Sequence, residues 1–188
     1  MTPHVARERF GRTYRQQSAL FRSLELESED ELSNQEFRLT PGVKAPAFSL
    51  LDQNGQEFSS SKLAGKKAIL YFYPAAGSPG CSKEAADFQD RISEFTDAGY
   101  EVIGISPDET AKLKDFEDAQ QLTFPLLSDP DLAAHKAYGA FGVKSLYGRT
   151  YEGVLRSTAI VDENFNVMDA FYSVKSTGHV DMLLKRIS

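Results

Sequence analysis

The sequence of 188 residues contains one cysteine, Cys81, and this scarcity excludes two kinds of site. A single thiol cannot form a disulfide within the chain, and it cannot supply a zinc site built on several thiolates. A lone unpaired thiol is typical of a reducing compartment, so we expect a cytoplasmic protein, with an organelle as the second option. The composition leaves open whether this thiol is a small buried group or a reactive one.

Long hydrophobic runs are absent as well, although 41% of the residues are hydrophobic and can form a core. The longest nearly apolar run, residues 68–76, is about half as long as a membrane span. No apolar segment of the kind found in secretory signals lies near the N-terminus, so we expect neither membrane insertion nor secretion. The formal net charge of −6 argues against binding to nucleic-acid phosphates as the main activity.

Residues 1–39 differ in composition from the rest and are predicted to be a helical N-terminal extension of a domain that spans residues 40–188. Five arginines and one acid precede residue 25, whereas residues 25–40 hold six acids and one base. Apolar side chains at helical spacing predict a helix over about residues 5–24. This helix could pack on its own domain or on a second subunit, act as an organellar transit peptide, or lie on a membrane surface.

The remainder of the chain alternates between strand and helix patterns. Apolar runs over residues 67–73 and 100–106 predict buried strands, and each is followed by a helical pattern. The further predicted elements are a hairpin around 52–55, helices over 82–98, 108–120, 131–138 and 178–187, and strands over 124–127, 157–161 and 167–172. This order predicts an α/β fold with a central mixed sheet flanked by helices on both faces.

Cys81 follows the predicted strand 67–73 and a loop rich in proline and glycine, at the expected start of a helix. Unpaired backbone N–H groups at a helix N-terminus favour a thiolate, and positions of this kind lower a cysteine pKa toward neutrality. Ser78 could donate a hydrogen bond to that thiolate, and Pro74 has no N–H with which to compete for it. The residues therefore predict an activated nucleophile, with an inert buried cysteine as the alternative.

The pattern Pro74-x-x-x-Ser78-x-x-Cys81 resembles the active-site signature of peroxiredoxins, and its surroundings are similar to the bacterioferritin-comigratory (PrxQ) subfamily. Segments at residues 42–48, 52–55, 63–67, 102–106 and 156–162 are similar to the same family. The resemblance covers about residues 40–188. It implies a thioredoxin-like peroxiredoxin fold and a thiol-dependent peroxidase that reduces hydrogen peroxide and organic hydroperoxides.

The resemblance also implies roles for five residues. Cys81 matches the peroxidatic cysteine, Ser78 the hydroxyl position at which most members have threonine, and Pro74 the shielding proline. Arg156 matches an arginine that reaches the thiolate from a distant strand, and Glu84 matches an acid that orients this arginine. Such donors would stabilise the negative charge that develops on the leaving oxygen of the peroxide.

Ala86 stands where many members of the subfamily carry a second, resolving cysteine. With one thiol, the sulfenic acid on Cys81 has to be reduced by an external thiol, which makes this a 1-Cys type. We expect thioredoxin, glutaredoxin or a low-molecular-weight thiol as the reductant, no cofactor or metal, and a monomer or homodimer. The alternative is a thioredoxin-fold redox sensor or binding protein without turnover.

The remaining polar candidates are predicted to be structural. His135 is expected to be a surface or capping residue, and His4 and His179 are assigned no role. Asp129 and Asp162 lie at predicted turns and caps, where aspartate usually makes local hydrogen bonds rather than binding a metal.

Overall fold

The computed structural model describes residues 37–146 and 149–188. The predicted helix over residues 5–24 lies outside the described residues, as do the alternatives weighed for it. Within the described part of the chain, no helix has the length and apolar character that crossing a membrane requires.

Nine strands and six helical segments are described. The strands are β1 (Ser49–Asp52), β2 (Glu57–Ser59), β3 (Lys67–Phe72), β4 (Tyr100–Ser106), β5 (Leu126–Ser128), β6 (Phe141–Leu146), β7 (Arg149–Val154), β8 (Ser157–Val161) and β9 (Val167–Phe171). The helices are the 3-10 helix η1 (Ser60–Leu63), α2 (Pro79–Asp90), α3 (Ile92–Asp97), α4 (Thr110–Gln120), α5 (Ala133–Ala137) and α6 (His179–Ile187).

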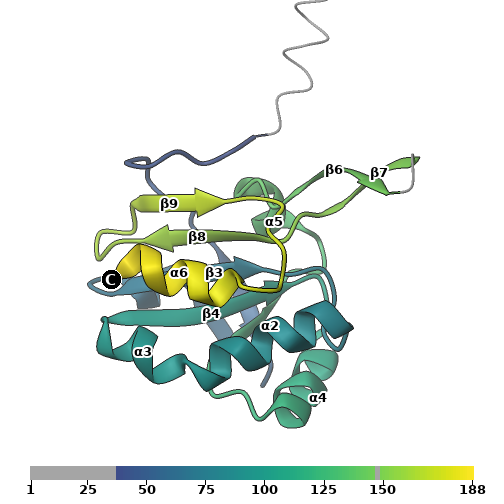
Figure 1. Cartoon of the computed structure of the whole chain (residues 1–188), viewed down its shortest axis with the longest axis horizontal. Helices are drawn as coiled ribbons and strands as arrows, with labels where there is room; N and C mark the ends of the chain where they lie inside the picture. Colours follow the sequence, from purple (N-terminus) through teal and green to yellow (C-terminus); the bar gives the residue numbers. More distant parts are fainter. Residues whose placement is uncertain (1–36, 147–148) are drawn as a thin grey trace, which may run out of the picture. The chain divides into compact units, whose positions relative to one another are not determined.

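Seven strands form one mixed sheet in the order β2-β1-β5-β4-β3-β8-β9 (Figure 1). The inner strand β3 pairs in parallel with β4 and antiparallel with β8. The sheet is therefore mixed, as the alternation of strands and helices predicts.

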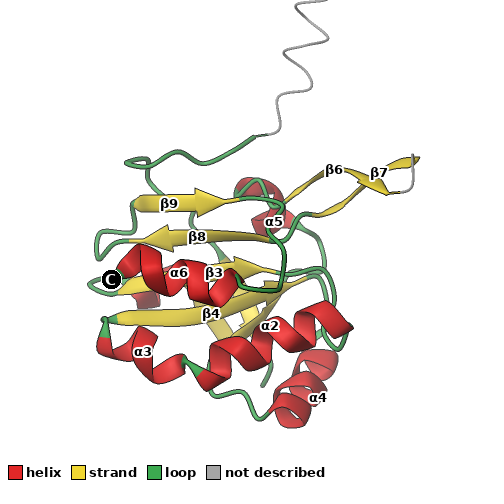
Figure 2. Ribbon diagram, in the orientation of Figure 1, coloured by secondary structure: helices red, strands yellow, loops and turns green. Residues whose placement is uncertain are grey.

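Alternate side chains of β3 point into two separate hydrophobic clusters, because successive residues of a strand face opposite sides of the sheet. Ile69 and Tyr71 belong to the cluster that includes residues of α2, α3, α4 and α6. Leu70 and Phe72 belong to the other cluster, which includes residues of η1 and α5. Figure 2 shows α2, α3 and α6 in front of the sheet. Helices thus cover both faces, as predicted.

The single helix predicted over residues 82–98 is wrong, because two helices occupy this stretch. Helix α2 begins earlier, at Pro79, since proline is well tolerated in the first turn of a helix. It ends at Asp90, because the next residue, Arg91, has a backbone (φ −112°, ψ 12°) that is not helical. The Arg91 guanidinium pairs with Glu94 and with Asp181 at 2.7 Å, so this residue links α3 to α6 at the break.

The sequence predicts some of the strand pairs correctly and misses one of them. The turn at residues 52–55 joins β1 and β2. The strands predicted over residues 157–161 and 167–172 are β8 and β9, which pair antiparallel, and β9 ends at Phe171. The strand predicted over residues 124–127 is shifted, since β5 begins at Leu126 after Pro125. The two-stranded sheet β6–β7 is not predicted from the sequence, and it projects from the main sheet in Figure 1.

Candidate active site

Cys81 lies in the first turn of α2, just beyond the carboxyl end of β3, and its side chain is buried. Pro79 at the first helical position has no N–H to offer. The first hydrogen bond of the helix runs from Ser82 N to Ser78 O at 2.8 Å. The backbone N–H groups of Gly80 and Cys81 precede this bond, so they are donors that the helix does not use.

The loop that leads to Cys81 is anchored to the end of β4. Asp108 accepts a hydrogen bond from Ala76 N at 2.6 Å through Oδ2. The same oxygen accepts from Ser106 Oγ at 3.0 Å, and Ser128 Oγ donates to the Asp108 carbonyl at 2.8 Å. The position of the loop is therefore fixed by three neighbouring strands, β3, β4 and β5.

Arg156 brings a positive charge to the sulfur. It directly precedes β8, and the pairing of Ser157 with Phe72 places it beside the end of β3. Its Nη2 donates to Cys81 Sγ at 3.3 Å, and its Nη1 donates to Glu84 Oε2. Burial opposes the charge of Arg156, but the Glu84 carboxylate and the Cys81 sulfur outweigh it and raise the pKa of the guanidinium.

Glu84 is fully buried and connects the arginine to a histidine. Its Oε1 lies 2.7 Å from His179 Nδ1, and His179 Nε2 lies 3.2 Å from Thr158 Oγ1. His179, to which the sequence assigns no role, is thus buried and hydrogen-bonded to Glu84. Val180, Leu183 and Leu184 mark the buried face of α6, and the spacing of His179 to Leu183 could have placed it on that face.

Ser78 and Pro74 lie in the loop before Cys81, but neither forms a hydrogen bond with the sulfur in the described part of the chain. Ser78 is the N-cap residue of α2, and its backbone is extended (φ −69°, ψ 149°). Its side chain makes no capping hydrogen bond with the helix. The structure thus brings together Cys81, Glu84 and Arg156, whereas the hydroxyl of Ser78 makes no hydrogen bond with Sγ.

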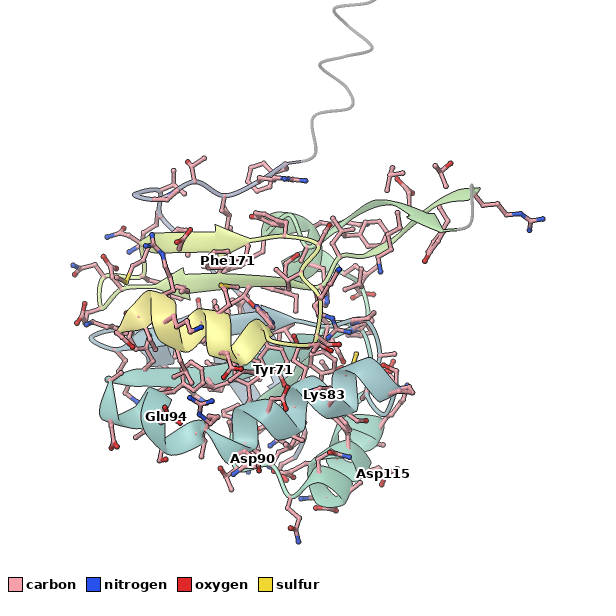
Figure 3. All side chains as sticks on the ribbon, viewed as in Figure 1. Tyr71, Lys83, Asp90, Glu94, Asp115 and Phe171 are labelled. Carbon is pink, nitrogen blue, oxygen red and sulfur yellow. The ribbon has the colours of Figure 1, made fainter. Side chains whose placement is uncertain are left out.

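Two stacked tyrosines lie beneath the site. The rings of Tyr71 and Tyr73 are 5.3 Å apart, and Tyr71, labelled in Figure 3, stacks on Phe88 of α2 at 4.5 Å. Burial raises the pKa of Tyr71 well above its ordinary value of 10.0, and Tyr73, Glu84 and Cys81 raise it further. Burial likewise raises the pKa of Tyr73. Both phenols are therefore neutral at physiological pH and add no charge beside the sulfur.

The hairpin β6–β7, which the sequence does not predict, carries a lysine whose charge interacts with the site. Lys144 of β6 lies opposite Tyr151 of β7. Partial burial lowers the pKa of Lys144 and the charge of Arg156 lowers it further, whereas the Cys81 sulfur opposes this change. The charge of Lys144 therefore interacts with those of Arg156 and Cys81.

His135 is a buried residue, so its predicted surface position is wrong. Its ring Nδ1 lies 2.6 Å from Asp129 Oδ2, and its backbone N–H donates to the same oxygen at 2.9 Å. The local roles predicted for Asp129 and Asp162 are confirmed, since Asp162 Oδ1 accepts from the backbone of Asn164 and Asn166. Among the described residues, no group of three or more histidine, cysteine and acidic side chains is arranged to hold a metal ion.

The comparison of the sequence with known proteins gives a consistent result. The AhpC/TSA family matches residues 41–170. A Mycobacterium tuberculosis H37Rv protein named as a peroxiredoxin is 54% identical over 151 residues, which cover 80% of this chain and 96% of that protein. Peroxiredoxin Bcp of Escherichia coli K12 is 37% identical over 146 residues, which cover 78% of this chain and 94% of the relative.

Solved structures agree with these relatives. Peroxiredoxin Q of Xanthomonas campestris matches with a TM-score of 0.73 at 32% identity, over 78% of this chain and 96% of that chain. The bacterioferritin comigratory protein of X. campestris, studied for its alkyl peroxide reduction activity, matches with a TM-score of 0.73 at 31% identity, over 79% and 97% of the two chains. The chain therefore belongs to the AhpC/TSA family, within which it is a one-cysteine peroxiredoxin of the Bcp/PrxQ type, a thiol-dependent peroxidase with a thioredoxin-like fold.

Proposed function

We propose that Cys81 is the peroxidatic nucleophile and that it reduces hydrogen peroxide and organic hydroperoxides through a sulfenic acid. The observation that carries this proposal is the distance of 3.3 Å between Arg156 Nη2 and Cys81 Sγ. A guanidinium beside a sulfur favours the thiolate, which is the nucleophilic form. Its planar fork can also donate to two acceptors at once, which a lysine cannot do with fixed geometry.

The reaction begins when the thiolate attacks one oxygen of the peroxide in line with the O–O bond. An S–O bond forms, the O–O bond breaks, and its electron pair leaves with the distal oxygen. That oxygen takes up a proton and departs as water or an alcohol, while Cys81 becomes a sulfenic acid. In this proposal Arg156, which donates to the sulfur, and the unused N–H groups at the start of α2 support the step by stabilising the charge that develops on the leaving oxygen.

Ser78 and Pro74 complete the pocket in this proposal. The Ser78 hydroxyl would donate a hydrogen bond to the bound peroxide, and its freedom from a capping role leaves it available for this. Serine lacks the methyl group that restricts the rotamer of threonine, so we expect peroxide reduction to be retained but slower than with threonine. Pro74 flanks the site without a backbone donor of its own.

The peroxide and a thiol reductant are the two reactants, and the second of them has to be external to this chain. A first thiol attacks the sulfenic sulfur, releases water and forms a mixed disulfide with Cys81. A second thiol then restores Cys81 and leaves as a disulfide. We propose thioredoxin, glutaredoxin or a low-molecular-weight thiol as the reductant, a monomer or homodimer as the active form, and the cytoplasm as its location, which the single unpaired thiol supports.

The alkyl peroxide reduction studied in the X. campestris neighbour supports organic hydroperoxides as substrates here as well. To test the proposal, the reduced enzyme is treated with one equivalent of peroxide and then with dimedone, and Cys81 is examined by mass spectrometry. We expect a dimedone adduct at Cys81 and multiple turnovers with at least one of glutaredoxin with glutathione, thioredoxin and a mycothiol-like donor. Turnover by Cys81→Ser would contradict the proposal, and an adduct without turnover would favour the redox sensor.

A further inference from the structure

The side of Glu84 that faces away from Arg156 is occupied by a histidine for which the proposed reaction has no use. His179 is the first residue of α6 and is buried, and its Nδ1 lies 2.7 Å from Glu84 Oε1. Ninety-five positions separate the two residues in the sequence. A charge-assisted hydrogen bond between wholly buried groups is among the stronger interactions available to a side chain.

The surroundings of His179 fix the direction of this hydrogen bond. An ionised carboxylate only accepts, so His179 Nδ1 carries the proton and donates to Glu84. Thr158 Oγ1 lies 3.2 Å from Nε2, and a hydroxyl can donate to a neutral ring or accept from a protonated one. On α2, the ring of Phe88 lies 6.2 Å from the His179 ring, centroid to centroid, and Asp181 on the helix of His179 pairs with Arg91.

The hydrogen bond also decides how Glu84 contacts the arginine. With Oε1 held by His179, only Oε2 is presented to Arg156, which binds it through Nη1. The second branch of the guanidinium, Nη2, is then left for Cys81 Sγ. Carboxylates prefer to bind arginine through both oxygens, so an unrestrained Glu84 would compete with the sulfur for Nη2.

We propose that His179 is a positioning residue for the peroxide reaction, which holds Glu84 in the orientation that divides the Arg156 fork between the carboxylate and the Cys81 sulfur. The proposal rests on the role of Cys81 proposed above. His179 does not touch the substrate, and its effect reaches the thiol through two intervening side chains.

Three variants test this role. His179→Leu removes the donor to Glu84. His179→Asn keeps an N–H near the position of Nδ1 but cannot carry a charge. His135→Leu is the matched control, because His135 is also fully buried and also bound to a carboxylate, on the other face of the sheet. For each protein we would measure the second-order rate constant with hydrogen peroxide and the pH dependence of Cys81 alkylation by iodoacetamide. Alkylation reports on Cys81 alone, because the chain has no other thiol.

We expect His179→Leu to lower the peroxide rate constant about 10-fold and to move the alkylation midpoint to higher pH, because a Glu84 released from His179 competes with the sulfur for Arg156 Nη2. His179→Asn should stay within about 3-fold of the wild type, and His135→Leu should lose stability without a change in the midpoint. A folded His179→Leu protein with the wild-type rate constant and midpoint would overturn the proposal. So would an equal loss in His179→Asn, which would point to packing rather than to the hydrogen bond.

A measurement on the unmodified enzyme covers the case in which His179→Leu does not fold. Nitrogen-15 spectra of the histidine rings should show His179 with its proton on Nδ1 in the reduced enzyme, and a ring protonated only on Nε2 would overturn the proposal. Failure of the proposed function can be told apart from failure of the proposal for His179. If Cys81 were not the nucleophile, Cys81→Ser would still consume peroxide, whatever the histidine variants do.

Discussion

Arg156 donates to the sulfur of Cys81 at 3.3 Å although 75 positions separate the two residues in the sequence. The contact follows from the sheet. Strand β8 runs antiparallel to β3 with Ser157 opposite Phe72, so the residue before β8 lies beside the residue after β3. The loop to α2 starts at that point, and the arginine meets the first turn of the helix there.

The first prediction concerns the charge of Arg156. Arg156→Met should lower the second-order rate constant with hydrogen peroxide about 100-fold, the range found when a donor to a developing oxyanion is removed. Competition with a haem peroxidase for limiting peroxide measures this constant. The rate constant of Arg156→Lys should lie between those of the wild type and Arg156→Met. Lysine keeps the positive charge, but one ammonium group cannot hold both Glu84 and Cys81 as the planar guanidinium does. An unchanged rate constant in Arg156→Met would refute the electrostatic argument.

The sequence predicts those parts of the site that depend on local pattern. An apolar run, a loop of proline and glycine and an amphipathic pattern place Cys81 between β3 and α2, because strand ends and helix starts depend on a few consecutive residues. The pairing of Arg156 with Glu84 has no such local signal. It could be expected only from the resemblance to a known family.

The environments of the two buried histidines, His135 and His179, could not be predicted from the sequence. Helix α5 has five residues, too few for a periodic face, so the burial of His135 against Phe72 could not be read from spacing. The partner of His179 lies 95 positions earlier in the chain. Tertiary packing, which no local pattern encodes, decides both environments.

A second prediction concerns the stability that Glu84 provides. Glu84→Gln keeps the shape of the side chain but leaves the partly buried charge of Arg156 without its carboxylate partner, so we expect the free energy of unfolding to fall by about 3 kcal/mol. Urea denaturation followed by circular dichroism measures this change. The matched control is Glu94→Gln, which breaks an Arg–Glu pair on the surface and should leave the urea midpoint nearly unchanged. Equal losses in the two variants would contradict the argument.

A third prediction concerns the packing of Tyr71 beneath the site. A side-chain carbon added at Gly104 of β4 would lie 2.8 Å from Tyr71 Oη and 3.0 Å from Leu126 Cδ2, both in the buried core. Gly104→Ala should therefore destabilise the fold by about 1–3 kcal/mol, as overpacking of a filled core does. Gly153→Ala is the control, because its nearest neighbours lie at an ordinary 3.6 Å. Thermal unfolding should separate the two variants, and similar melting temperatures would show that the core yields to the added methyl group.

The last prediction concerns the buried pair of Asp129 and His135. Burial alone would raise the pKa of Asp129, but the hydrogen bonds from the His135 ring and backbone outweigh it and hold the pKa below its ordinary value of 3.8. A carboxyl group whose pKa is lower in the folded state stabilises the fold above its unfolded pKa and loses this contribution as the pH falls through the folded value. Asp129→Asn should thus be less stable than the wild type at pH 7, and the difference should shrink below about pH 4.

Unfolding in urea at several pH values measures this difference, with the exposed Asp131→Asn as the control. The control should follow the wild type at every pH, because Asp131 is exposed and lies outside the buried pair. If the gap between wild type and Asp129→Asn stayed constant from pH 7 to pH 3, the hydrogen bonds to His135 would not depend on the carboxylate charge. The stability of the pair would then come from packing against Phe72, whose ring meets the His135 ring edge-on at 5.2 Å.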